Sequence, residues 1–194
     1  WVHCKGMPHI TFAEREGMLE ITQHDPLQRS LLWPQRFAIT FVGDGWERVE
    51  EVNLSGERAT LPIPEGTQVI LPNTDGRGYG LFIPTPETMA WLLTHWHEVA
   101  DDTARQSLLM MLYENYQARL LDAEAWLQAL LIGLPVERNQ LVASTLCSYL
   151  GEPLREVGTA DIEAQLWRWS EEHPLTSCRL QLMRSLIAHA RAQK

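Results

Sequence analysis

The spacing of apolar residues changes at Pro84-Thr85-Pro86. Before this point, short apolar or alternating runs are separated by Gly and Pro, a pattern typical of strands and turns. After it, apolar residues recur every three or four positions, as in amphipathic helices. The pattern predicts an α+β chain with segregated domains: a small antiparallel β-sandwich at residues 1–85 and an all-α C-terminal domain, short or truncated, at residues 86–194.

Seven strands are expected in the first part, at residues 9–13, 18–23, 36–42, 47–53, 57–61, 68–71 and 79–83. Turn signals such as Glu16-Gly17 and Gly43-Asp44-Gly45 separate them. Phe37, Ile39 and Phe41 alternate with milder residues, so one face of that strand is strongly apolar. Short strands at this spacing favour a sandwich.

Helices are expected from residue 86 and then at about residues 102–121, 122–132, 136–150, 160–172 and 176 to near the C-terminus. Thr85 is the expected N-cap of the first helix, and Gly151 with Pro153 beyond it is the expected stop of the fourth. Short connections favour antiparallel helix pairs, and their irregular spacing favours a loose, solenoid-like array over a regular repeat.

Composition describes a soluble globular protein: 194 residues, 45% apolar and 21% charged. The net charge of -9, with basic residues scattered among acids, argues against nucleic acid and against an anionic membrane surface. No stretch reaches the roughly 18 apolar residues of a spanning helix, so no membrane insertion by this segment is expected. Trp1, rather than Met, at the first position favours a fragment of a longer protein.

Cys4, Cys147 and Cys178 are far apart in the sequence and odd in number. They provide neither a disulfide framework nor a zinc motif. We expect ordinary thiols that are buried or partly buried.

Two segments contain metal-ligating residue types. His97-Glu98-Val99-Ala100-Asp101 resembles the zinc motif His-Glu-x-x-His, but Asp101 stands in the last position and the segment falls between two expected helices. His3, Cys4 and His9 have suitable side chains without the spacing of a closed four-ligand site. We interpret the first as a solvated helix terminus and the second as a polar or partly buried segment.

Other candidate chemistry is equally limited. The run Gly76-Arg77-Gly78-Tyr79-Gly80 does not lead into a helix, so we interpret it as a tight turn before the last strand. No Gly-x-Ser-x-Gly elbow is present. Eight Trp residues are present, and five are expected in helices, as residues that pack between layers: Trp91, Trp96, Trp126, Trp167 and Trp169. The alternative is that one or two of them line a concave groove that faces a peptide.

Several strings in the first part carry a family resemblance. They are Trp1-Val2-(x)3-Gly6-Met7-Pro8, Leu19-Glu20-Ile21-Thr22-Gln23, Trp33-Pro34, and Val69-Ile70-Leu71-Pro72-Asn73 leading to Gly78-Tyr79-Gly80-Leu81. Together they resemble the region of zinc aminopeptidases of the aminopeptidase N family where the catalytic domain passes into a small β-sandwich. The sequence departs from the common ending Gly-Tyr-Tyr-Arg-Val of that family, having Gly78-Tyr79-Gly80-Leu81-Phe82.

The second part continues the resemblance. Asp101-Asp102-(x)2-Arg105, the junction Leu121-Asp122 and Glu137-Arg138-Asn139 are similar to the C-terminal helical domain of the same family. The resemblance implies a metallopeptidase, a hydrolase that removes N-terminal residues from peptides. In that family a separate domain holds zinc through His-Glu-x-x-His and a distant Glu, and a Gly-Ala-Met-Glu-Asn-like segment binds the amine of the substrate.

None of those motifs occurs in this chain, so no catalytic, cofactor-binding or metal-ligating residue is assigned to it. The resemblance implies that zinc belongs to a catalytic domain of the same polypeptide, and that this region spaces and encloses the chamber for the peptide substrate. The alternative is a non-enzymatic helical-repeat scaffold that binds a protein or peptide partner. Composition does not decide between a cytoplasmic and a periplasmic parent.

Overall fold

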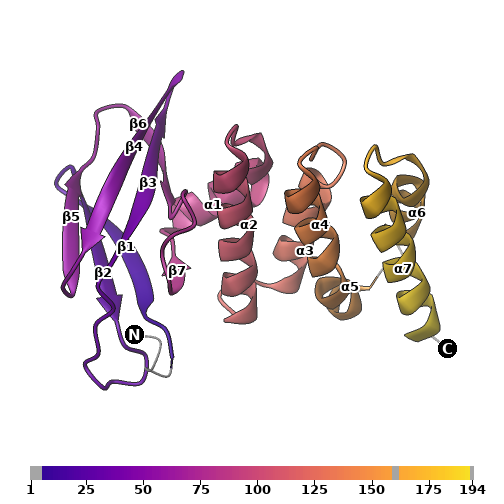
Figure 1. The fold of residues 1–194 in the computed structure, drawn as a ribbon, viewed down its shortest axis with the longest axis horizontal. Helices are drawn as coiled ribbons and strands as arrows, with labels where there is room; N and C mark the ends of the chain where they lie inside the picture. Colours follow the sequence, from indigo (N-terminus) through magenta and orange to yellow (C-terminus); the bar gives the residue numbers. More distant parts are fainter. Residues whose placement is uncertain (1–5, 159–161, 193–194) are drawn as a thin grey trace. The chain divides into compact units, whose positions relative to one another are not determined.

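The computed structural model describes residues 6–158 and 162–192, and in this part of the chain strands come first and helices follow (Figure 1). The predicted α+β class, with strands and helices segregated along the sequence, is therefore confirmed. The chain separates into two compact units, residues 1–92 and 93–194. We call them the β unit and the helical unit.

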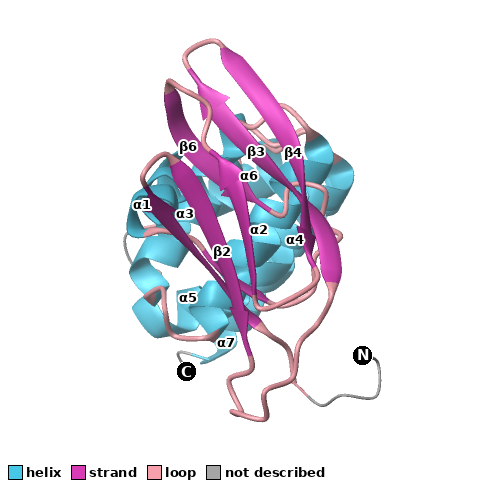
Figure 2. Cartoon of the chain, turned by 90° about the vertical axis from the view of Figure 1, so that its left-hand side faces the viewer, coloured by secondary structure: helices cyan, strands magenta, loops and turns pink. Residues whose placement is uncertain are grey.

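The β unit contains two sheets. One has the order β5-β2-β1-β7 and the other the order β4-β3-β6. The strands are β1 (His9–Arg15), β2 (Met18–His24), β3 (Gln35–Gly43), β4 (Trp46–Leu54), β5 (Arg58–Pro62), β6 (Thr67–Pro72) and β7 (Leu81–Ile83). Strands of the two sheets run in similar directions in Figure 2.

The two sheets pack through apolar side chains on their facing sides. The ring of Phe37 in β3 meets that of Phe82 in β7 edge to face, with centroids 5.0 Å apart. Phe37, Ile39 and Phe41 have no exposed surface, as their alternation predicted, and Leu71 from β6 is 1% exposed. Burial of such side chains contributes about 1.5–3 kcal/mol each and is the main source of stability of this unit.

One pair of strands differs from the antiparallel prediction. β1 and β7 run parallel, with His9 opposite Leu81 and Thr11 opposite Ile83. The segment between β6 and β7 carries the chain from one sheet to the other, and the amide of Leu81 donates to the carbonyl of Pro8 at 2.9 Å. β7 therefore enters at the end of the sheet where β1 starts, which makes the two strands parallel.

The division between the units lies within α1 (Pro86–His95), later than the boundary at residue 85 expected from the sequence. The first turns of α1 belong to the β unit. Thr85 accepts a hydrogen bond from the amide of Thr88 at 3.2 Å, as expected of an N-cap. The hydroxyl of Thr88 in turn donates to the carbonyl of Ile70 in β6 at 3.4 Å.

The helical unit begins in the last turn of α1. Its further elements are the 3-10 helix η1 (Trp96–Glu98), α2 (Asp102–Gln117), α3 (Ala123–Gly133), α4 (Gln140–Tyr149), α5 (Gly151–Val157), α6 (Glu163–Glu172) and α7 (Thr176–Ala192). α4 contacts both α2 and α7, and α6 packs along α7. Leu108, Leu130 and Leu146, from three of these helices, have no exposed surface.

Side-chain caps explain where three of these helices start. Asp101 accepts a hydrogen bond from the amide of Ala104 at 2.8 Å, and Asp122 accepts one from Ala125 at 2.8 Å. Asn139 accepts from the amide of Leu141 at 2.9 Å. Each cap satisfies an amide that has no partner within the helix, a contribution of about 1 kcal/mol.

The fourth helix ends near Leu150 as predicted, since α4 stops at Tyr149 with Leu150 as its C-cap, but Gly151 and Pro153 do not act as stop residues. Gly151 and Pro153 lie in the first turn of α5, an element that the sequence did not indicate. A proline in the first turn removes no helical hydrogen bond, because amides there lack helical acceptors. α5 ends at Gly158, whose φ of 95° is in the region that favours glycine and whose amide donates to the carbonyl of Leu154 at 3.0 Å.

Candidate functional site

The sequence segments that carry the family resemblance contact one another in pairs at three places, which we call junctions. In the β unit, Gln23 at the end of β2 is fully buried. Its side-chain oxygen accepts a hydrogen bond from the amide of Trp33 at 2.9 Å, and its nitrogen donates to the carbonyl of Gly56 at 2.7 Å. Gln23 thus joins its own strand to the segment that contains Trp33, and both of its polar atoms are used structurally.

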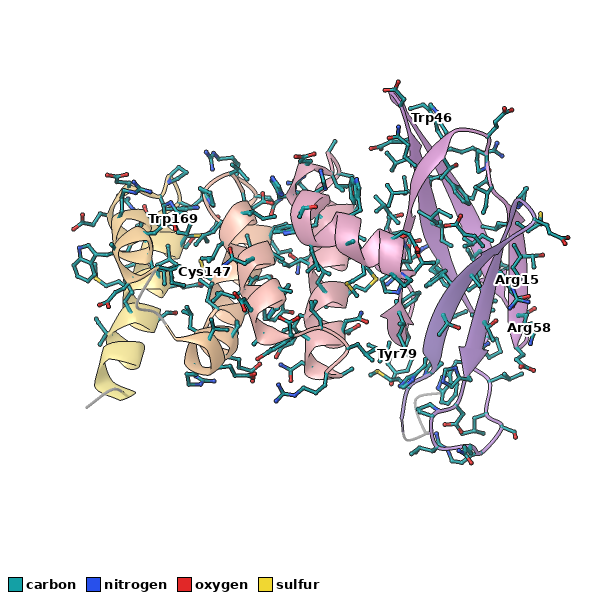
Figure 3. The ribbon with its side chains drawn as sticks, turned by 180° about the vertical axis from the view of Figure 1, so that it is seen from behind. Arg15, Trp46, Arg58, Tyr79, Cys147 and Trp169 are labelled. Atoms are coloured by element: carbon teal, nitrogen blue, oxygen red, sulfur yellow. The ribbon has the colours of Figure 1, made fainter. Side chains whose placement is uncertain are left out.

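A second junction joins the start of β1 to the start of β7. Tyr79, labelled in Figure 3, donates from its hydroxyl to the carbonyl of Gly6 at 3.2 Å. Gly80 has a φ of 144°, and a Cβ on it would lie 2.7 Å from the carbonyl oxygen of Pro8. Only glycine fits there without a shift of the backbone. The run of glycines therefore serves a chain crossing, in agreement with its interpretation as a turn.

A third junction lies in the helical unit and centres on Glu137. This side chain is 2% exposed, and its carboxylate accepts from Arg105 Nε at 2.9 Å and from Nη2 at 3.2 Å. It also accepts from the backbone amides of Arg138 and Asn139, at 2.8 and 2.7 Å. A buried carboxylate requires such a complete set of donors, since desolvation otherwise makes its charge very costly.

Arg105 extends this network towards the start of α2. Its Nη1 donates to the carbonyls of Val99 and Ala100 at 2.7 and 2.9 Å, and its Nη2 pairs with Asp102. Asp102 in turn accepts from the side chain of Asn139 at 2.6 Å. Glu137 raises the pKa of the guanidinium above its ordinary value, mainly by hydrogen bonding. The network fixes the loops before α2 and before α4 to each other, so its role is structural.

The segment that resembles a zinc motif is divided between two elements. His97 lies in η1, whereas Asp101 is the N-cap of α2, where its carboxylate is engaged by the amide of Ala104. The two side chains therefore do not share a helical face, which a His-Glu-x-x-His site requires. The structure thus agrees with the interpretation of this segment as a helix terminus.

His3 and Cys4 of the second metal candidate lie outside the described residues, as does Trp1. His9 is described, and it stands opposite His24 of the neighbouring strand. Burial lowers the pKa of His9, and the nearby His24 lowers it further. Within residues 6–158 and 162–192, no group of three or more His, Cys, Asp or Glu side chains is arranged to hold a metal ion.

The Trp residues mostly pack, as expected. Trp96 and Trp126 have no exposed surface, and Trp169 is 8% exposed. Trp126 lies in a cluster with Tyr113, Tyr116 and Tyr149, of which the rings of Tyr113 and Tyr149 stack with centroids 3.9 Å apart. Trp167 differs, because 49% of its surface is exposed.

Cys147 and Cys178 are both buried, in agreement with the expectation of ordinary thiols. They come from α4 and α7 and share a hydrogen bond. Burial raises the pKa of both thiols, so neither is a thiolate nucleophile near neutral pH. Figure 3 shows Cys147 within the helical unit.

Glu114 of α2 is a half-buried carboxyl near Tyr149, and burial raises its pKa from 4.5 to about 7. In this pH range the folded state holds the proton more tightly than the unfolded chain does. The free energy of unfolding is therefore expected to fall as pH rises from about 4.5 to about 7, and then to level off. In Glu114→Gln the side chain does not titrate, so this decrease in the free energy of unfolding is expected to be absent.

The expected gain in stability of Glu114→Gln at about pH 8 is about 1–2 kcal/mol, after allowance for solvent screening. Urea unfolding of both proteins across this range measures it. Glu124→Gln, at an exposed position of α3, is the matched control and should follow the parent curve. Parallel curves for Glu114→Gln and the parent protein would show that Glu114 titrates normally.

No protein-family model matches the sequence, and no curated protein shows significant similarity to it. No helix in the described part of the chain combines the length and the apolar character needed to cross a membrane. The three junctions are therefore the most specific features available for a functional argument.

Proposed function

We propose that this chain is a non-catalytic C-terminal region of a zinc metallo-aminopeptidase of the aminopeptidase N family. In this proposal the β unit is a spacer sandwich. The helical unit is part of a solenoid-like array of helix pairs that encloses the chamber for the peptide substrate. Zinc and the residues that activate water belong to a catalytic domain of the same polypeptide.

The proposal is supported by contacts between the sequence segments that resemble the aminopeptidase N family. Gln23 contacts Trp33, Gly80 contacts Pro8, and Arg105 contacts Glu137. Each contact joins two strings that were selected by resemblance alone, and in the last two contacts the strings are distant in sequence. Such a set of strings is what a shared fold requires, since each member fits only beside its partner. The order of two sheets followed by helices supports the same proposal.

The proposal predicts that the chain alone, supplied with zinc, releases no amino acid from aminoacyl fluorogenic substrates. The reason is that metal-activated hydrolysis needs about three protein ligands and a base, which the proposal assigns to the catalytic domain. Turnover that a chelator abolishes would contradict it.

The genomic sequence upstream of the codon for Trp1 provides the positive test. A His-Glu-x-x-His motif within about 150 residues is expected. If the reading frame contains no such motif, the non-enzymatic scaffold replaces the aminopeptidase. One observation favours this second function: Trp167, Leu180 and Ile187 of α6 and α7 are exposed apolar side chains, at 49%, 54% and 45%.

A further inference from the structure

Two histidines face each other on the outer side of the β1–β2 hairpin. His9 and His24 are directly opposed in the antiparallel register. Their ring centroids are 5.1 Å apart, and the ring planes are inclined at 77°. His9 is half-buried, and His24 is exposed. The sequence had associated His9 with His3 and Cys4, whereas the fold gives it a histidine from the neighbouring strand.

The separation of the two rings matches a shared metal ion. A nitrogen ligand lies about 2.0–2.1 Å from zinc, which places the centroid of each imidazole ring about 3.2 Å from the metal. Two rings bound at a tetrahedral angle then have centroids about 5.2 Å apart. The observed distance of 5.1 Å is therefore compatible with one ion bound between the two rings.

We propose that His9 and His24 form a two-imidazole site for a borderline transition-metal cation, Zn²⁺ or Cu²⁺, on the surface of the β unit. The protein supplies two coordination positions, and water or a small exogenous ligand fills the others. Imidazole nitrogen suits Zn²⁺ and Cu²⁺, whereas Mg²⁺ and Ca²⁺ prefer oxygen ligands. The site is distinct from the catalytic zinc of the proposed function and does not depend on it.

Two carboxylates lie near His24, and their contacts decide whether they can also bind the ion. Asp25 follows His24, but both of its oxygens are engaged by Arg29, at 2.8 and 2.9 Å, and by the amides of Leu27 and Arg29. Glu57 lines the same hollow of about 380 Å³ as His24. His9 does not line this hollow, so the hollow adjoins the site on the His24 side only, and the negative charge of Glu57 attracts a cation. Asp25 is held away from coordination by its ion pair.

A metal ion bound here links β1 to β2 by a second connection besides their backbone hydrogen bonds. The strand register brings the two imidazoles together only in the folded hairpin, so the ion binds the folded state more tightly than the unfolded chain and occupancy raises the stability of the β unit. With two protein ligands the ion exchanges more readily than in a closed four-ligand structural site.

The test titrates the purified 194-residue chain with Zn²⁺ and with Cu²⁺, by calorimetry and by the rise in the thermal unfolding midpoint. The variants are His9→Gln and His24→Gln, with His95→Gln, a half-buried histidine of α1, as the control. Loss of either imidazole of the pair is expected to weaken binding about tenfold or more, and His95→Gln is expected to leave it unchanged. Electron paramagnetic resonance of the Cu²⁺ complex should show two nitrogen ligands in a His3→Gln background, which removes the copper-binding set formed by the amino terminus with His3.

Circular dichroism of each metal-free variant confirms that it is folded, and His24→Gln changes only an exposed side chain. Equal metal affinity in the parent chain and in both pair variants would overturn the proposal. So would an equal response to Mg²⁺, since that result would show general attraction to an acidic surface. Loss of affinity in only one variant of the pair would also contradict a shared ion.

Discussion

Replacement of Trp96 by Ala is expected to lower the free energy of unfolding of the helical unit by about 3–5 kcal/mol. Trp96 is fully buried, and its Nε1 donates to the carbonyl of Ala129 at 2.8 Å. The ring fills the space beside Gly133, where a Cβ would lie 2.2 Å from Trp96 Cζ2. The substitution therefore creates a cavity and removes the partner of a buried carbonyl. Urea unfolding followed by circular dichroism at helical wavelengths measures the change.

Trp167→Ala is the matched control for this prediction. It removes the same side chain from the same unit, but 49% of Trp167 is exposed. A smaller loss of about 1–2 kcal/mol is expected, because about half of the surface of Trp167 is buried, whereas all of Trp96 is. Equal losses for the two variants would show that packing around Trp96 does not hold η1 against α3.

Glu137→Ala is expected to destabilise the helical unit by a similar amount, about 3–5 kcal/mol. The substitution leaves the charge of Arg105, whose side chain is 12% exposed, without its main partner. It also leaves the amides of Arg138 and Asn139 without their acceptor. Removing one member of a buried pair costs more than the pair itself contributes, since the remaining charge is desolvated. Urea unfolding again gives the value.

A double-mutant cycle with Arg105→Ala separates the pair from the other contacts of Glu137. The double variant is expected to lose less stability than the sum of the single losses, because each single variant leaves one unpaired group. Glu124→Ala, at an exposed position, should change stability by about 0.5 kcal/mol or less. Additive losses at Arg105 and Glu137 would refute the energetic coupling of these side chains.

Most strands and helices were predictable because their signals are local. The alternation of Phe37, Ile39 and Phe41 gave β3, which spans Gln35–Gly43. Asp101 and Asp122 each stand just before a segment in which apolar residues recur every three or four positions. Both are N-caps in the structure. Period and capping depend on neighbours within a few residues, so they can be read from one sequence.

Features that depend on distant contacts were not predictable. Gly151 and Pro153 carry the usual signs of a helix stop, but the packing of Leu154, 2% exposed, favours a further helix. The expected start of α4 near residue 136 was too early, because Glu137 accepts hydrogen bonds from the amides of Arg138 and of the cap Asn139, which therefore lie before the helix. No local pattern indicates that Glu137, in the loop before α4, meets Arg105 of α2.

The same limit applies to the candidate sites. The sequence drew attention to His97 and Asp101, which are close along the chain but lie in different elements. It gave no indication of His9 with His24, because their proximity follows from the strand register and not from spacing. The assignment of the catalytic residues to another domain stays a prediction, and the upstream sequence tests it.

The parallel pairing of β1 with β7 has a consequence for how the β unit is made. Its first and last strands are neighbours, so the sheet β5-β2-β1-β7 is incomplete until Ile83 has left the ribosome. A shortened protein that ends before β7 therefore leaves the edge of β1 unpaired. Such an open sheet edge is an aggregation hazard during biosynthesis.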